Sequence, residues 1–264
     1  MPTGWLDLFG AAISGGAVVK IADYLYSEYQ RRSDESRSIK KLVDKHLDPI
    51  LKAADELVGK VASLAKEDFR ELRRVAPPGE GDLKDQIVLT NILYLIAQFW
   101  ARIQLLRLES LYSDLARENT GRRISGFLAA LEANRNRLVD RAWQRAIGEA
   151  LIIFRGEKAE ILTYHDFVER YAQAATFRAW FEPLASLLQQ TNHTRYRQRF
   201  LVYGAILHSF IDTLDQKHVV VREIPAWPNK LSRRSRRDLE YRVFKVYLPF
   251  VKGPRKYCRT PDRK

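Results

Sequence analysis

A nearly continuous apolar stretch runs from Ile87 to Leu108, and six polar residues in and around it fall on one line. These polar residues are Lys84, Asn91, Gln98, Arg102, Glu109 and Ser113, and their spacings of four or seven residues repeat one face of a helix. A long helix with one narrow polar stripe is typical of the central, mostly buried member of a helical bundle. The alternative is a membrane-spanning helix with a polar lining, against which the crowding of Arg102, Gln104 and Arg107 counts.

Helical periodicity continues on both sides of this stretch, because apolar residues recur at three- and four-residue steps. The predicted helices are Ser33–Val75, Asp82–Ala116, Arg122–Glu160, Tyr164–Trp180, one from Pro183, and Arg195–Leu214. Pro49, with Asp48 as N-cap, is predicted to begin a new helix or to kink the first one. Val219–Ile224 is predicted as a short strand or extended segment. The sequence therefore predicts an all-α fold, an antiparallel bundle of five to seven helices.

The N-terminal segment from Trp5 to Tyr26 is apolar and rich in small residues. As a helix it would rise about 33 Å, close to the ~30 Å hydrocarbon thickness of a bilayer. Its continuously apolar part is shorter, from Leu8 to Val19. We predict a single membrane-anchor helix here. The alternative is a helix that docks on the rest of the protein, for which an apolar length of about 10–14 residues is typical.

Basic residues follow the apolar stretch Leu8–Val19 and none precedes it; they are Lys20, Arg31, Arg32, Arg37, Lys40 and Lys41. This bias predicts that the bulk of the chain lies in the cytoplasm, and the absence of a preceding basic residue argues against a cleaved signal peptide. Gly10 and Ser14 are four residues apart, a spacing that allows close helix contact in lipid, so this face is predicted to pair two copies of the chain. We divide the chain into an anchor with its charged flank (1–32), a helical bundle (33–224) and a basic C-terminal tail (225–264).

Positive charge is concentrated in that tail, which is also rich in aromatic residues. Residues 222–264 carry +10 of the +13 net charge. The predicted binding residues are Arg233, Arg234, Arg236, Arg237, Arg242, Lys245, Lys252, Arg255 and Lys256. Cations interleaved with aromatic rings suit either anionic lipid headgroups or the phosphates and bases of a nucleic acid. The third interpretation is a solvated tail with a small hydrophobic dock.

Two further clusters stand out. Arg141, Arg145, Glu149 and Arg155 are predicted to form a polar core cluster, either an anion site or a network of ion pairs that fixes helix packing. Gly148 would let a second helix approach closely. His208, Asp212 and Asp215 lie on successive helical turns, with His218 just beyond. Such a set could hold a divalent cation, but a His beside an Asp on one helix is common without metal. We predict neither a metal nor a cofactor.

No catalytic motif accompanies these clusters. The sequence contains no phosphate-binding loop, no dinucleotide fingerprint, no HExxH zinc motif and no GxSxG nucleophile elbow. Cys258 is the only cysteine, which excludes an intramolecular disulfide, and it lies in a segment predicted to be exposed. Thr163 to Asp166 is predicted to cap a helix start.

Short helical blocks at residues 46–54, 90–100, 143–149, 177–184 and 211–215 resemble a large family of uncharacterised bacterial proteins with an N-terminal membrane helix. The likeness spans residues 5 to 220. The resemblance implies a cytoplasmic helical domain tethered to the bacterial cytoplasmic membrane, and it implies no reaction.

The sequence therefore predicts a non-enzymatic, membrane-associated helical scaffold or interaction protein. The first alternative is a soluble, cytoplasmic nucleic-acid-binding protein that acts through the basic tail. The second alternative is an enzyme with an unrecognised polar core site.

Overall fold

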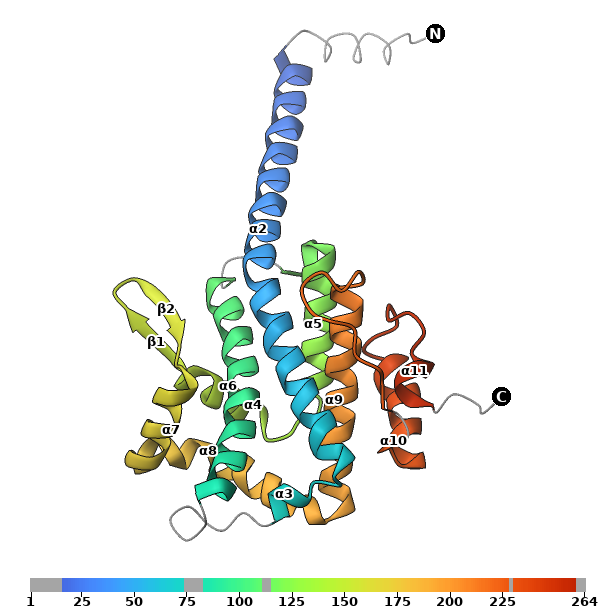
Figure 1. The fold of residues 1–264 in the computed structure, drawn as a ribbon. Helices are drawn as coiled ribbons and strands as arrows, with labels where there is room; N and C mark the ends of the chain where they lie inside the picture. The colour runs from blue at the N-terminus through green and yellow to red at the C-terminus, as the bar shows by residue number, and fades with distance from the viewer. Residues whose placement is uncertain (1–15, 74–82, 111–114, 228–229, 260–264) are drawn as a thin grey trace, which may run out of the picture.

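The chain folds into a bundle of helices from which one long helix projects (Figure 1). The computed structural model describes residues 16–73, 83–110, 115–227 and 230–259. Within these ranges lie the helices α2 (Gly16–Lys66), α3 (Arg70–Arg73), α4 (Leu83–Glu109), α5 (Asn119–Glu132), α6 (Arg141–Ala150), α7 (Tyr164–Gln173), α8 (Ala175–Gln189), α9 (Thr194–Leu214), α10 (Arg233–Asp238) and α11 (Arg255–Cys258). Short 3-10 turns lie at Leu115–Arg117 and Gln190–Asn192, and a π-helical turn, η4, at Leu239–Phe244. The all-α prediction is confirmed.

The apolar helix α4 lies at the centre of the bundle, packed against both α2 and α6. Ile92, Leu93 and Ile96 on α4 are fully buried. By length and composition Ile87–Glu109 could cross a membrane, but 61% of its apolar window is buried inside the protein, as in the core helix of a globular bundle. Over its described length this helix is therefore mostly buried.

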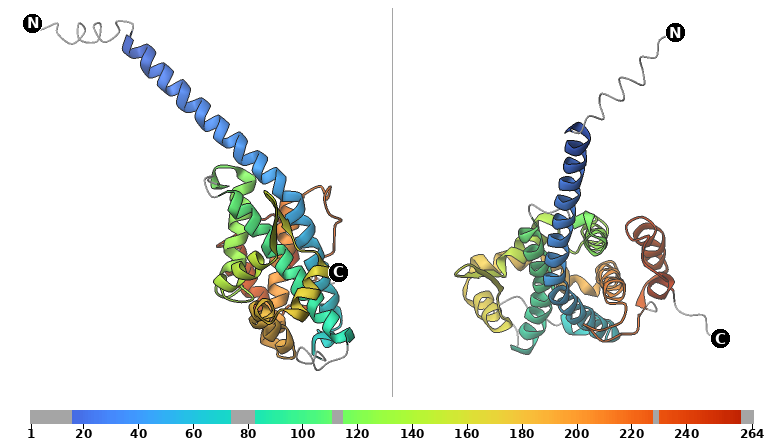
Figure 2. Two further views of the ribbon diagram at one scale, coloured as in Figure 1. Left: turned by 90° about the vertical axis from the view of Figure 1, so that its left-hand side faces the viewer. Right: turned by 90° about the horizontal axis from the view of Figure 1, so that it is seen from above.

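Helix α2 has a free part and a packed part (Figures 1 and 2). Among its described side chains, Asp34, Arg37 and Ser38 are exposed, and burial begins at Ile39. From there α2 packs on α4 and α9 down to its C-terminal end. The part before Ile39 extends about 35 Å beyond the bundle at 1.5 Å per residue. The predicted pairing residues Gly10 and Ser14 lie outside the described residues.

Helix α2 runs through Pro49 without interruption, so the prediction of a new helix capped by Asp48 is wrong. Proline in a helix interior costs about 3 kcal/mol, because one hydrogen bond is lost and the ring crowds the preceding turn. The residues that follow, Ile50 and Leu51, are fully buried in the core. Tertiary packing of this turn therefore outweighs the local preference.

The single helix predicted for Arg122–Glu160 is also wrong. The chain breaks after α5, where the Asn136 side chain donates to the Ala130 carbonyl (2.8 Å), and Asp140 caps α6 by accepting from the Ala142 amide (3.0 Å). An antiparallel hairpin follows, in which β1 (Ile152–Arg155) pairs with β2 (Lys158–Ile161). Its two-residue turn contains Gly156 at φ +63°, which glycine adopts without strain.

The close approach predicted at Gly148 is confirmed. A Cβ atom at this position would lie 2.9 Å from the backbone carbonyl carbon of Trp100 on α4. The glycine thus sets the distance between α6 and α4, the partner helix at the centre of the bundle.

We expect Gly148→Ala to lower the free energy of unfolding by about 2 kcal/mol, because the added methyl group meets backbone that cannot rotate away. Urea denaturation followed by circular dichroism measures the change. Gly59→Ala is the matched control, since a Cβ there meets nothing within 4 Å, and it should leave stability unchanged or raise it. Equal stability of the two variants would contradict the close-contact role.

The C-terminal basic region is folded over its described length. Leu239, Val243, Phe244 and Tyr257 are buried, and α11 packs on α9. The segment Val219–Ile224 forms no strand. It bends at Val219–Val221, whose three backbone N–H groups donate to the Asp215 carboxylate. Residues 230–259 are thus part of the globule, and their exposed cations are held on a fixed scaffold.

Candidate functional site

The arginines of the C-terminal region line an open groove together with residues from two distant parts of the chain. The groove has a volume of about 1290 Å³ and lies between the α5–α6 loop, the first turns of α9, and α10 with η4. Its charged lining residues are Arg135, Arg195, Arg199, Arg234, Arg242 and Asp238. A second hollow of about 550 Å³ shares four of these residues and adds Arg233 and Arg237. We call the two hollows together the arginine groove.

Gln198 on α9 holds the α10 wall of the groove in place. Its side-chain nitrogen donates to the Lys230 carbonyl (3.1 Å), and its oxygen accepts from the Ser232 amide (2.8 Å). Ser232 in turn caps α10 by accepting from the Ser235 amide (3.2 Å). These bonds join segments more than 30 residues apart, so the arginines of α10 are fixed relative to those of α9.

Positive charge in the groove is poorly compensated. Within the described ranges the only carboxylate that lines it is Asp238, which lies 3.6 Å from Arg242. Burial lowers the pKa of the Arg199 guanidinium, and the nearby charges of Arg195 and Arg137 lower it further. Arginines crowded together in this way repel one another and attract an anion.

The predicted tail residues fall into two groups. Arg233, Arg234, Arg237 and Arg242 line the groove. The other five do not. Arg236 donates to the Leu231 carbonyl (3.0 Å) and Lys245 lies over the Tyr241 ring (4.5 Å). Lys256 pairs with Asp212 (2.5 Å), while Lys252 and Arg255 are exposed elsewhere.

Three groove residues were not among the predicted binding residues, namely Arg135, Arg195 and Arg199. Arg195, Arg197 and Arg199 occupy every second position near the start of the predicted helix Arg195–Leu214, and this run of charge was a usable signal. Arg135 carries no such signal, because only the break between α5 and α6 brings it to the groove.

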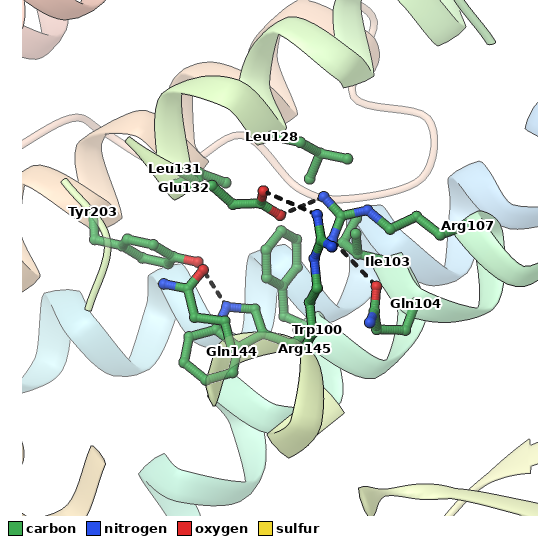
Figure 3. Close-up of a pocket in the computed structure, with 11 residues that line it drawn as sticks. Trp100, Ile103, Gln104, Arg107, Leu128, Leu131, Glu132, Gln144, Arg145 and Tyr203 are labelled. Atoms are coloured by element: carbon green, nitrogen blue, oxygen red, sulfur yellow. Dashed lines mark hydrogen bonds and ion pairs between the residues drawn. The ribbon is translucent and has the colours of Figure 1, made fainter. Parts of the chain in front are cut away.

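The predicted polar core cluster centres on a glutamate that the sequence analysis did not select. Glu132 at the end of α5 is approached by Arg107 of α4 and by Arg145 (3.9 Å), as Figure 3 shows. Arg141 also lies 3.2 Å from the Glu132 carboxylate. The Glu132 side chain is only 12% exposed. Its carboxylate is the common partner of three arginines. The adjoining cavity of about 20 Å³ has room for a single water molecule and for no larger ligand.

Two residues of the predicted cluster lie apart from Glu132. Glu149 accepts a hydrogen bond from the Gln104 side chain (3.0 Å). Arg155 lies on the hairpin and pairs with Glu160 (3.5 Å). The arrangement favours the network of ion pairs that joins α4, α5 and α6 over an anion site, because Glu132 already occupies the position of the anion.

The His/Asp group at the C-terminal end of α9 and just beyond it contacts the C-terminal helix α11. Asp212 accepts from the Tyr257 hydroxyl (2.5 Å) and pairs with Lys256, both on α11, and its other oxygen lies 3.8 Å from His208 and from His218. Burial lowers the pKa of His208, with Asp212 acting in the opposite direction. Among the described residues no group of three or more metal-ligating side chains is placed to hold an ion. These contacts support a structural role.

Cys258 is fully buried, so the prediction that it is exposed is wrong. Burial, with a contribution from Glu240, raises the pKa of the thiol to about 12. A thiol in this state is a poor nucleophile at neutral pH.

The predicted helix cap at Thr163 is confirmed, because its hydroxyl accepts from the Asp166 amide (3.2 Å).

No protein-family model matches the chain, and neither a curated protein nor a solved structure matches it. The resemblance of the short helical blocks to a bacterial family therefore stays a prediction.

Proposed function

We propose that the protein is a non-enzymatic, membrane-associated interaction protein whose helical bundle is held away from the bilayer by the free part of α2. The single observation that carries the proposal is that α2 leaves the bundle before Ile39 and projects alone over its remaining described length (Figure 2). A helix that packed on the bundle throughout would have supported the docked alternative. The apolar stretch Leu8–Val19 overlaps the start of this projecting helix in sequence.

The lengths are consistent with this arrangement. The helical residues from Lys20 to Ser38 span about 28 Å at 1.5 Å per residue, enough to separate the bundle from a headgroup layer. Lys20, Arg31 and Arg32 follow the apolar stretch directly, where cations favour the cytoplasmic face of a bilayer. The interpretation as a scaffold rather than an enzyme is supported by the roles of the polar clusters, which join helices to one another.

Membrane retention of the full-length chain tests this proposal. We expect the tagged protein, expressed in bacteria, to stay in the membrane pellet through carbonate extraction, and a variant lacking residues 1–30 to move to the supernatant. Replacing Ile13 and Val18 by lysine should have the same effect, since a charge at the centre of a membrane helix costs about 3 kcal/mol.

The matched control replaces Gly10 and Ser14 by leucine. This variant keeps or increases apolarity, so it should stay in the membrane, while chemical cross-linking between copies should fall if the small-residue face pairs them. Full-length protein in the soluble fraction, or carbonate-resistant retention of the truncated chain, would contradict the membrane proposal.

A further inference from the structure

The arginine groove is built for an extended anionic ligand rather than a small one. Its volume of about 1290 Å³ is above the roughly 300–1,000 Å³ of most small-molecule sites. It continues into the second hollow through Arg135, Arg234 and Arg242, which line both. A ligand that contacts every arginine must therefore reach from the first turns of α9 across α10.

The cations that line the groove are arginines, and no lysine lies among the described lining residues. The planar guanidinium group pairs its N–H donors with two oxygens of one phosphate, whereas a lysine ammonium acts as a point charge. Arg135, Arg195 and Arg234 are exposed and make no hydrogen bond or ion pair with the described parts of the chain. Their donors are thus available to a ligand.

An aromatic ring borders the same groove. Tyr247 lines it and is 38% exposed, next to Val246 at 66%. Exposed rings beside a track of cations are the platform on which bases of a single strand stack. An acidic peptide could pair its carboxylates with the arginines, but it has no bases to stack on the exposed ring.

The position of the groove argues against membrane lipid as the ligand. Lys230, three residues before α10, lies 3.8 Å from Asp68, just beyond the C-terminal end of α2. The start of α2 is about 75 Å away along the helix, far beyond the ~8–10 Å over which charges act in physiological salt. Figure 1 shows α10 beside the lower part of α9, toward the end of the bundle opposite the projecting helix.

We propose that the arginine groove binds the phosphodiester backbone of a single-stranded nucleic acid, RNA or DNA. Phosphates lie along the arginines of the α5–α6 loop, α9 and α10, and a base stacks on Tyr247. This site goes beyond the proposed membrane association and does not depend on it, since the groove is complete within the bundle.

Fluorescence anisotropy with the full-length chain in neutral detergent tests the proposal, using labelled oligothymidine and oligouridine of about 20 nucleotides. We expect the triple variant Arg135→Ala/Arg195→Ala/Arg234→Ala to bind both oligomers roughly 10- to 100-fold more weakly. The slope of log affinity against log salt should fall by about 2, or about 0.7 for each phosphate that is no longer neutralised. Tyr247→Leu should weaken binding about fivefold or more while leaving the salt slope unchanged.

The matched control is Lys158→Ala/Arg170→Ala/Lys217→Ala, which removes the same charge from exposed positions outside the groove. It should bind within about twofold of the parent, so that a fall in affinity is assigned to the groove and not to net charge. The three groove side chains are exposed, and circular dichroism should show both triple variants to be folded.

Several outcomes would overturn the proposal. They are an equal fall in affinity in the groove and control variants, no binding of either oligomer, a duplex bound more tightly than single strands, or polyglutamate competing as well as the oligomers at equal charge. Groove-dependent binding of phosphatidylglycerol vesicles without oligomer binding would assign the groove to lipid instead.

Discussion

Glu132→Gln should lower the free energy of unfolding by about 2–3 kcal/mol, because it removes the one carboxylate on which three arginines converge. Breaking a buried pair by removing one partner costs about 3–5 kcal/mol. The expected value is lower here, since Arg141 and Arg145 are half exposed and solvent screens their share. The loss falls mainly on Arg107, whose side chain is 28% exposed.

Urea denaturation at neutral pH measures this effect, with Glu157→Gln as the control. Glu157 is exposed at the tip of the hairpin, and the same substitution there should change stability by less than about 0.5 kcal/mol. The double variant Glu132→Gln/Arg107→Gln should be less destabilised than the sum of the two single changes, because each already breaks the shared pair. Additive losses, or equal stability of the Glu132 and Glu157 variants, would show that Glu132 does not join the three helices.

Asp215→Asn should cost about 2–4 kcal/mol at neutral pH, the largest single loss we expect. The Asp215 carboxylate accepts the backbone amides of Val219 (2.8 Å), Val220 (2.8 Å) and Val221 (3.0 Å). An amide in its place turns an NH₂ group toward some of these donors and leaves N–H groups, that of the buried Val221 among them, without a good acceptor. The chain after α9 would then lack the hydrogen bonds that set its direction.

The stability lost in Asp215→Asn should be larger at neutral pH than at acidic pH. Burial raises the pKa of Asp215, but the three backbone N–H donors outweigh it, so the pKa lies below its ordinary value. A carboxyl whose pKa is lower in the folded state stabilises fully above its unfolded pKa of about 3.9, and this contribution is lost as pH falls through the folded value. The stability difference between parent and Asp215→Asn should therefore be largest near pH 7 and shrink below about pH 4.

Asp44→Asn is the control for both measurements, because Asp44 is exposed on α2. It should be nearly neutral at either pH. A difference between parent and Asp215→Asn that stays constant from neutral to acidic pH would mean that the carboxylate charge is not what the three amides require.

Helical periodicity predicted α4 and α9 as helices. On α4 the polar stripe at Asn91, Gln98 and Arg102 lies on the less buried face, whereas α9 is buried on every side from Phe200 to Ile211. The positions at which helices end were harder to predict. Periodicity alone cannot separate the apolar residues Ile152 and Ile153 of a hairpin from the end of a helix, since short apolar runs suit both.

The arginine groove, too, could be predicted from the sequence only in part. Composition located four of its arginines in the C-terminal region, because charge density is visible along the chain. It could not separate them from Lys256, which neutralises Asp212, or join them to Arg135 and Arg199. Those relations depend on how Gln198 fixes α10 against α9, a contact across more than 30 residues.

The continuity of α2 has a mechanical consequence. Because one uninterrupted helix joins the projecting part to the core, the rotational setting of the whole bundle follows the helical phase of residues 16–38. Each residue inserted or deleted there would turn every surface of the bundle by about 100° around the helix axis. The number of residues in this stretch thus dictates which side of the protein faces a neighbouring molecule.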